Sequence, residues 1–335
     1  MFYDPYGNCL ISENFGDVNN KTILIIRILG NDLSSLHSKD QTYNNLKFTF
    51  ENETDFNKLT NKYKIDYLYI LNRIYSKEKL NKLKELLNTH NKKFIEIEFD
   101  YNKFYDCFDE SNFTIIKKDF DFSKQYRENI KKVNNYLKNF NLYLINNNGS
   151  RNFGLKYGKE HNYTWTFVLD SNSYFTNKLF TNIIDNINDN SRYILIPQIR
   201  IAEVNLKNDD LIEDKITDDT NDKLINFPSR EPQLAFHLES KFKFNEEIPY
   251  GSAPKQEMIN LITGKKHLNK DIDAYHHYKI EQRPKTDENH QKLSRVIRLD
   301  PDNPNNKIHR NQINRQEGLY NLVCEIKNDS NVFTK

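Results

Sequence analysis

The stretch NNNGSRNFGLKYGKEHNYTWTFVLDSNSYFT, residues 146–176, decides the fold class. Its first half contains Gly149 and Gly154, which permit a tight turn and the close packing of a helix against a sheet. Its second half, residues 163–170, is an apolar run without a charge until Asp170, which is typical of a buried strand. A helix that leads into a buried strand ending in a carboxylate is either plain architecture or half of a nucleotide-binding site.

The sequence before this stretch alternates between strand and helix patterns. Apolar runs at 21–32, 63–74 and 92–100 predict three strands. Between the second and third run, residues 76–91 predict an amphipathic helix with Ser76 as its N-cap. Each predicted strand ends in polar residues that favour a loop.

The sequence after residue 100 continues the alternation. The patterns predict helices at 123–140, 146–161, 175–187 and 256–268, and strands at 141–145, 163–170, 191–201 and 230–244. Pro197 marks a bulge or an edge within its strand. Residues 203–228 predict an acidic surface excursion, and residues 281–317 a flexible segment that wraps over a site. The alternation predicts an α/β sandwich with a mainly parallel central sheet.

Composition excludes several classes of protein. The 335 residues carry 49 Lys and Arg against 47 Asp and Glu, which argues against a dedicated nucleic-acid-binding protein. Three distant cysteines support neither a disulfide framework nor a zinc site. The first 20 residues do not resemble a signal peptide, and no run approaches the roughly 20 apolar residues of a membrane span. We therefore expect a soluble, cytoplasmic protein without a membrane span.

Polar residues follow each predicted strand, where ligands of open parallel sheets bind. These residues are Arg27, Asn31, Asp32, Asn72, Arg73, Asp100, Asp170 and Asn172. The alternative is that strand ends are polar only because loops meet water. Several such positions together favour a site.

Arg151 lies in the first turn of its predicted helix, where a cation opposes the helix dipole. This position indicates an outside partner such as a phosphate, or else an ion pair with Asp170. Asp170 and Asn172 project the same way if the strand continues through them. Two oxygen donors at this spacing suit Mg²⁺ or Mn²⁺.

Residues 146–176 resemble the central stretch of GT-A glycosyltransferases of the family-2-like kind. Those enzymes carry an Asn-x-Gly-x-x-Arg-Asn-x-Gly-like helix, an apolar strand and an Asp-x-Asp-type metal motif. Over residues 22–325 the chain is also similar to uncharacterised fungal and giant-virus proteins, through the segments RILGNDLSSLH, YILNRI, REPQLAFH and YGSAPKQE. The resemblance implies one GT-A-like, Rossmann-type domain over 1–335, with a nucleotide-binding half at 22–190 and a sugar and acceptor half at 191–335. If the chain is viral, the resemblance implies a location in the host cytoplasm or the virion.

The resemblance implies transfer of a sugar from a UDP-sugar to a hydroxyl of an unknown glycan, protein or small-molecule acceptor, with Mn²⁺ or Mg²⁺ as cofactor. Asp170 and Asn172 fall on the metal motif, and Arg151 falls on the arginine that faces the diphosphate. Asn172 stands where the pattern prefers Asp, which predicts weaker metal binding. The remaining expected donor-binding residues are Arg27, Asn31, Asp32, Arg73, Asp100 and Gln233.

The resemblance also implies a carboxylate near the acceptor. Glu257 is the candidate general base, Glu231 competes for that role, and Gln233 is expected to hold sugar hydroxyls. Either glutamate could equally be a solvated charge or a helix N-terminal stabiliser. His309 is the expected late metal ligand, with His276 and His277 as alternatives.

Two other functions fit the same sequence. The chain could be a catalytically inactive GT-A-shaped module that binds nucleotide sugars, which Asn172 favours. A nucleotidyltransferase is disfavoured, because RILGNDLSS has one glycine and no lysine where a phosphate loop would need more.

Overall fold

The computed structural model describes residues 21–108, 127–201, 232–251, 255–264, 289–299 and 308–333. For residues 127–131, 200–201, 308–312 and 330–333 it describes the backbone alone. All structural statements below concern these residues.

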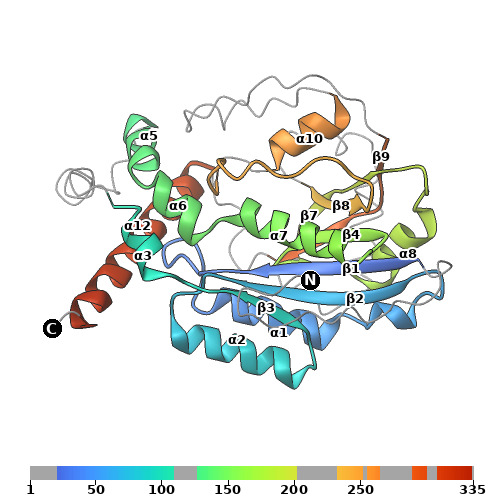
Figure 1. The fold of residues 1–335 in the computed structure, drawn as a ribbon, viewed down its shortest axis with the longest axis horizontal. Coiled ribbons are helices and arrows are strands. Elements are labelled where there is room, and N and C mark those ends of the chain that lie inside the picture. Colours follow the sequence, from blue (N-terminus) through green and yellow to red (C-terminus); the bar gives the residue numbers. More distant parts are fainter. Residues whose placement is uncertain are drawn as a thin grey trace.

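A seven-stranded sheet forms the centre, in the order β3-β2-β1-β4-β8-β6-β9 (Figure 1). Its strands are β1 (Thr22–Leu29), β2 (Lys64–Asn72), β3 (Phe94–Ile97), β4 (Trp165–Asp170), β6 (Tyr193–Ile196), β8 (Gln233–His237) and β9 (His290–Lys292). Only β8 pairs antiparallel with its neighbours, β4 and β6. The predicted Rossmann-like α/β fold with a mainly parallel sheet is confirmed.

Helices cover both faces of the sheet. On one face lie α1 (Gln41–Asn52), α2 (Lys77–Thr89), α8 (Asn177–Asn186) and the short 3₁₀ turn η1 (Phe56–Lys58). On the other lie α7 (Asn147–Glu160) and α10 (Gln256–Thr263). In β1, Ile23 and Ile25 pack on the α8 side, and Leu24 and Ile26 pack on the α7 side. A strand buried on both faces explains the continuous apolar run in the sequence.

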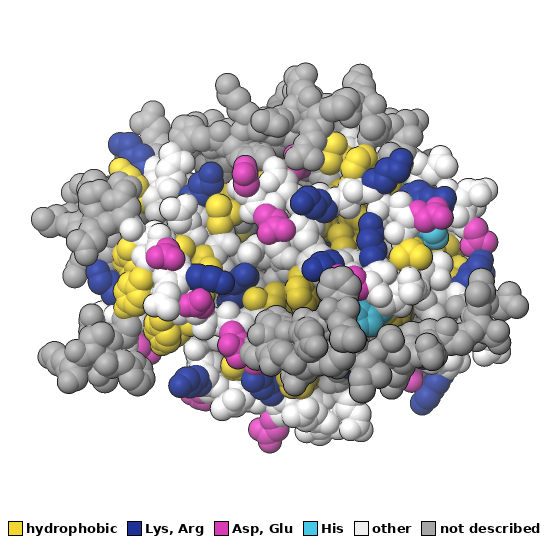
Figure 2. All heavy atoms as spheres, viewed as in Figure 1, with side chains coloured by type: hydrophobic (Ala, Val, Ile, Leu, Met, Phe, Trp, Pro, Cys, Tyr) yellow, Lys and Arg dark blue, Asp and Glu magenta, His cyan; other side chains and the backbone are white. Residues whose placement is uncertain are grey.

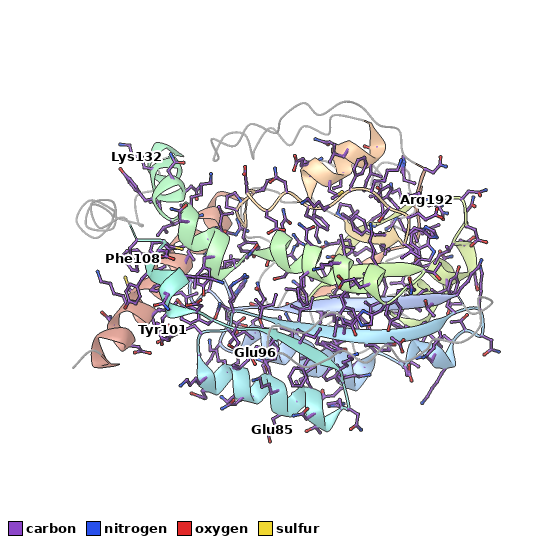
Figure 3. The ribbon with its side chains drawn as sticks, viewed as in Figure 1. Glu85, Glu96, Tyr101, Phe108, Lys132 and Arg192 are labelled. Carbon is purple, nitrogen blue, oxygen red and sulfur yellow. The ribbon has the colours of Figure 1, made fainter. Side chains whose placement is uncertain are left out.

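A group of helices lies at the carboxyl end of the sheet (Figure 1). They are α3 (Tyr101–Tyr105), α5 (Arg127–Tyr136), α6 (Lys138–Leu144) and α12 (Ile308–Phe333). Leu33, which follows β1, packs in the same cluster as Leu319 of α12. Figure 3 shows Tyr101, which follows β3, at this end, and Arg192, which precedes β6, at the opposite end.

A second sheet of three strands has the order β5-β10-β7. Its strands are β5 (Ser173–Tyr174), β10 (Val296–Leu299) and β7 (Gln198–Ile201). The strand predicted at 191–201 is therefore two strands, β6 and β7, in different sheets. Pro197 stands between them, and it has no N–H with which to continue a ladder.

The strand predicted at 141–145 is wrong, because most of these residues belong to α6. Val133, Leu137, Phe140 and Leu144 are all buried in one cluster. Their spacing of three or four residues continues the helical period through the segment. The apolar run 142–145 has four residues and is too short to distinguish a strand from a buried helix.

Regular structure replaces part of the flexible segment predicted at 281–317. Within it, β9, β10 and the start of α12 are ordered elements. The acidic excursion predicted at 203–228 lies outside the described residues. No helix in the described part of the chain is both long and apolar enough to cross a membrane. Figure 2 shows Lys and Arg side chains interspersed with Asp and Glu over the visible face, in keeping with the small net charge.

Candidate functional site

Four polar side chains from different elements meet at the carboxyl end of β4; we call them the Asp170 cluster. Oδ1 of Asp170 accepts a hydrogen bond from Nη2 of Arg151 at 2.9 Å. Oδ2 accepts one from Nζ of Lys255 at 2.9 Å and one from Nε2 of Gln233 at 2.9 Å. Lys255 also donates to Oε1 of Gln233 at 2.8 Å. The ion pair between Arg151 and Asp170 was one of the two predicted alternatives for Arg151.

Close packing of α7 on the sheet brings Arg151 to this position. Oδ1 of Asn146 accepts a hydrogen bond from the N–H of Gly149 at 2.9 Å and caps the helix. Gly149 was expected to form a turn, but it lies inside α7, where a Cβ would meet the Asn146 side chain at 2.3 Å. A Cβ on Gly154 would come within 2.6 Å of Ile26 of β1. The predicted close packing at Gly154 is therefore confirmed.

The two cations of the cluster are buried and the carboxylate is its most exposed charge. The side chains of Arg151 and Lys255 are 3% and 2% exposed, and that of Asp170 is 28% exposed. Burial by itself would raise the pKa of Asp170, but Lys255 and Arg151 outweigh it and hold that pKa well below its usual range. Asp170 is therefore ionised at neutral pH and is too weak a base to take a proton from a substrate hydroxyl.

The guanidinium of Arg151 has further contacts within α7 and beyond it. Nη1 donates to Oδ1 of Asn148 at 2.7 Å, and its central carbon lies 5.4 Å from the centre of the Phe244 ring. Nε is buried and has no hydrogen-bond partner among the described residues. Arg151 thus retains one unused donor next to the carboxylate that it binds.

The described residues do not fit a Mn²⁺ or Mg²⁺ site. Both oxygens of Asp170 already accept hydrogen bonds from cations, and the side-chain charges of Asp170, Arg151 and Lys255 give the cluster a formal charge of +1. Asn172 donates from Nδ2 to the carbonyl of Leu299 at 3.2 Å, which ties its amide to β10. No group of three or more His, Cys, Asp or Glu suited to a metal is found in the described ranges. The side chain of His309 lies outside them, as do His276 and His277.

Arg27 is not brought to the Asp170 cluster. Along β1 it shares the face of Ile23 and Ile25, whereas Asp170 shares the opposite face of the sheet with Val168. Its Nη2 donates to both carboxylate oxygens of Glu53, at 2.7 and 2.8 Å. Burial by itself would lower the pKa of Arg27, but Glu53 raises it, so the guanidinium stays charged. The pair ties β1 to the end of α1.

Asn31 joins three elements at the carboxyl end of the sheet. Its Nδ2 donates to the carbonyls of Arg73, at 2.8 Å, and Leu144, at 3.2 Å. Its Oδ1 accepts from the N–H of Tyr75 at 3.0 Å. All three hydrogen bonds join the Asn31 side chain to backbone groups, two after β2 and one at the end of α6. Asn31 therefore fixes the loops that follow β1 and β2.

Arg73 and Asp100 meet at Tyr143, a residue that the sequence analysis did not single out. The guanidinium carbon of Arg73 lies 5.4 Å from the centre of the Tyr143 ring, and the hydroxyl of Tyr143 donates to the carbonyl of Asp100 at 2.8 Å. Arg73 has a positive φ of 46°, uncommon for a residue with a side chain. The Asp100 side chain caps α3 by accepting from the N–H groups of Asn102 and Lys103.

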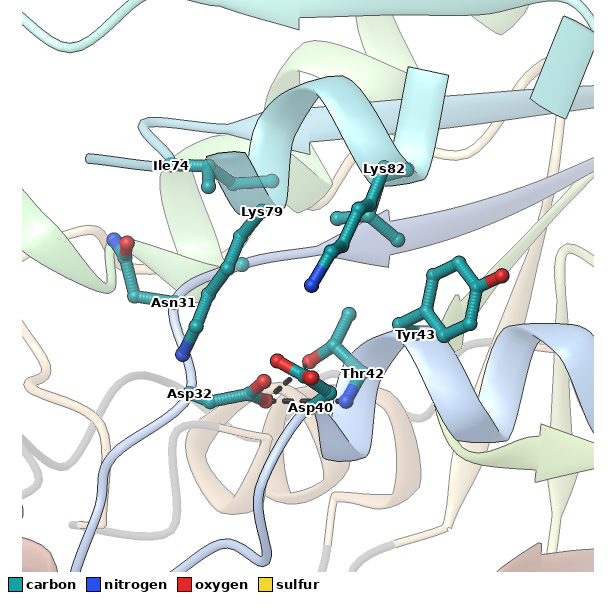
Figure 4. Close-up of a pocket in the computed structure, with 10 residues that line it drawn as sticks. Asn31, Asp32, Asp40, Thr42, Tyr43, Ile74, Lys79 and Lys82 are labelled. Carbon is teal, nitrogen blue, oxygen red and sulfur yellow. Dashed lines mark hydrogen bonds between the residues drawn. The ribbon is translucent and has the colours of Figure 1, made fainter. Parts of the chain in front are cut away.

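Asp32 belongs to a different place, a pocket between α1 and α2 (Figure 4). Its Oδ1 accepts from the N–H of Thr42 at 3.1 Å and from its hydroxyl at 2.6 Å, which fixes the start of α1. Lys79 and Lys82 line the same pocket together with Asp40. Charges of both signs therefore face this pocket, and it has no clear preference for an anion.

Of the two candidate general bases, only Glu257 lies within the described residues. Glu257 is 3% exposed and lies in the first turn of α10, two residues after Lys255. Glu231 lies outside the described residues. Gln233, expected to hold sugar hydroxyls, donates to Asp170 and accepts from Lys255 instead.

Lys255 is the cluster residue that the sequence analysis missed. It is the N-cap residue of α10, where a cation opposes the helix dipole. The same argument singled out Arg151, so the signal was present in the segment Lys255–Glu257.

Comparisons with known proteins leave the family open. No protein-family model and no curated protein matches the chain. Among solved structures, the chain is similar to a mycobacterial protein at 7% identity, with a TM-score of 0.25, over 65% of this chain and 54% of that one. The chain thus spans about half of that protein. It is also similar to the apo form of mouse xyloside xylosyltransferase 1 at 10% identity, with a TM-score of 0.28, over 78% of this chain and 85% of that one.

Proposed function

We propose that the protein is a glycosyltransferase that binds the diphosphate of a UDP-sugar at the Asp170 cluster and transfers the sugar to an acceptor hydroxyl. The observation that carries the proposal is the pair of buried cations, Arg151 and Lys255, on the carboxylate at the carboxyl end of β4. Ligands of open parallel sheets bind at this edge. The sequence of residues 146–176, which resembles the central stretch of GT-A glycosyltransferases, gives the ligand class.

Positive charge at this position suits the departure of a nucleoside diphosphate. As the bond between the anomeric carbon and the phosphate oxygen breaks, negative charge develops on the diphosphate. Arg151 and Lys255 are already oriented by Asp170 and Gln233, so their stabilisation of that charge needs little reorganisation. Asp170 acts here as a positioning residue.

The acceptor hydroxyl needs a separate base, because Asp170 is held ionised by its two cations. Glu257 is the described carboxylate that we assign to this role, next to Lys255 on α10. The hydroxyl oxygen would attack the anomeric carbon, its proton would pass to the carboxylate of Glu257, and UDP would leave with the bonding electrons. Arg73, Tyr143 and Asp100 are assigned to the nucleoside.

Calorimetric titration tests the proposal with UDP-glucose, UDP-galactose, UDP-GlcNAc, UDP and GDP-mannose. We expect one UDP-sugar to bind, and UDP release to follow when an acceptor is supplied. Glu257→Gln should keep binding and lose UDP release. Failure of every ligand in the panel to bind would contradict the proposal. Binding of a UDP-sugar without UDP release from any acceptor pool would favour the inactive binding module instead.

A further inference from the structure

We propose that Lys255, together with Arg151, takes the place of a divalent cation, so that the chain binds a diphosphate group without metal. This inference rests on the proposed function and adds the chemistry by which the site holds its ligand. It differs from the expectation of Mn²⁺ or Mg²⁺ that the sequence resemblance carries.

The first support is the occupation of the carboxylate. A divalent cation in an Asp-x-Asp-type site needs a carboxylate oxygen of Asp170 as a ligand. Oδ2 accepts hydrogen bonds from Lys255 and Gln233, both at 2.9 Å. Oδ1 accepts from Arg151 at 2.9 Å. The ammonium of Lys255 therefore occupies the side of the carboxylate where a metal would bind.

The second support is the charge of the cluster. Among the four side chains of the cluster, two buried cations face one carboxylate, so these side chains together repel a further cation and attract an anion. The repulsion is strongest in a buried setting, where water screens little. Asn172 adds a neutral amide, and that amide donates to Leu299. The pair Asp170 and Asn172 thus lacks the negative charge that normally holds Mg²⁺ or Mn²⁺.

The third support is the donor capacity of the cluster and the side from which solvent reaches it. Nε of Arg151 is buried without a hydrogen-bond partner among the described residues. The Asp170 side chain, through which the cluster reaches solvent, is 28% exposed. Phosphate oxygens arriving from that side would accept from the same N–H groups that Asp170 now engages, as charge-assisted hydrogen bonds.

The test uses inorganic pyrophosphate as the probe and the full chain as the protein. Affinity is measured by calorimetry in EDTA and again in Mn²⁺. We expect the wild type to bind pyrophosphate equally, within about twofold, in the two buffers. A requirement for Mn²⁺, or no binding in EDTA, would overturn the inference. Electron paramagnetic resonance of Mn²⁺ added to the wild type without phosphate is a further check. It should detect no Mn²⁺ bound at Asp170, so the spectrum with Asp170→Asn should be the same as with the wild type.

Variants of the lysine provide the second arm. Lys255→Met removes the charge and keeps the length of the side chain. Its affinity for pyrophosphate in EDTA should fall at least about tenfold, the expected loss for a hydrogen bond to a charged group. Added Mn²⁺ should restore part of it, because Oδ2 of Asp170 no longer has the ammonium beside it and keeps only the neutral donor Gln233. Lys255→Arg should retain metal-free binding. Unchanged affinity of Lys255→Met in EDTA would overturn the inference.

Lys93→Met is the matched control, because Nζ of Lys93 donates to the hydroxyl of Tyr157 at 2.8 Å, outside the cluster. Its pyrophosphate affinity should equal that of the wild type. The wild-type comparison stays decisive even if Lys255→Met does not fold.

This test separates the inference from the proposed function. Metal-free binding of pyrophosphate without binding of any UDP-sugar would support metal-free diphosphate binding and contradict the proposed glycosyltransferase function. Binding and turnover of a UDP-sugar only with Mn²⁺ would support the proposed glycosyltransferase function and contradict metal-free diphosphate binding.

Discussion

Lys255 and Asp170 are 85 residues apart in sequence and joined by a hydrogen bond of 2.9 Å between Nζ and Oδ2. The bond connects the start of α10 to the end of β4. Because Arg151 of α7 binds the other oxygen of the same carboxylate, two helices on one face of the sheet converge on a single charge at the end of β4. Asp170 is therefore expected to matter for stability as well as for binding.

Asp170→Asn should destabilise the fold by about 3 kcal/mol, because two buried cations then lose the carboxylate that they share. The measurement is the free energy of unfolding in urea at pH 7. Asp189→Asn is the control, since Asp189 pairs with Lys21 at the surface, where ion pairs contribute less than about 1 kcal/mol. Equal effects of the two variants would contradict the importance of the cluster.

Arg27→Met should lower the free energy of unfolding by about 3–5 kcal/mol, because Glu53 is then buried without its partner. The affinity of the folded variant for the UDP-sugar should stay within about twofold of the wild type, since Arg27 lies on the other face of the sheet. Thermal unfolding and calorimetry at a low temperature measure the two effects. A tenfold loss of affinity would instead support the sequence-based assignment of Arg27 to the donor.

His37 should make stability depend on pH between about 4 and 6.5. Burial, with the nearby charges of Arg315, Arg298 and Lys79, lowers its pKa to about 4, and its Nδ1 accepts a hydrogen bond from the N–H of Leu33 at 2.9 Å. The unfolded chain therefore binds a proton before the folded one as pH falls. Stability is fully present above about pH 6.5 and is lost towards pH 4, by up to about 3 kcal/mol.

His37→Gln tests this expectation through urea unfolding at pH 4, 5, 6 and 7. The difference in stability between wild type and variant should shrink as the pH falls. A difference that is constant over this range would show that folding does not shift the pKa of this histidine. His90→Gln, at the end of α2, serves as the histidine control.

Gly158→Ala should destabilise the fold by about 1–3 kcal/mol through overpacking. A Cβ at this position would lie 2.1 Å from Oγ1 of Thr166 of β4, so either the Thr166 side chain or α7 would have to shift. Gly30→Ala is the control, because a Cβ there meets nothing within 4 Å. If both variants melt at the same temperature, the close contact between α7 and β4 is not needed for stability.

Elements with local signals could be predicted from the amino-acid sequence. The apolar run before Asp170 specified β4, and Ser76, which accepts a hydrogen bond from the N–H of Lys79, specified the start of α2. The alternation of these elements was enough to predict a mainly parallel α/β sheet. The segment 141–145 was assigned wrongly because the four apolar residues after Asn141 fit a strand and a helix equally, and only packing with Val133 and Leu137 selects the helix.

The pairing of the buried charges depends on how distant segments pack. Arg27 stands near the end of a predicted strand and Arg151 near the start of a predicted helix, but the alternation of β1 sends Arg27 to Glu53 on one face, and the packing of α7 sends Arg151 to Asp170 on the other. Lys255 reaches the same carboxylate from 85 residues away. A buried cation must find an acceptor, but which acceptor it finds depends on contacts between distant segments, and local sequence signals do not encode that choice.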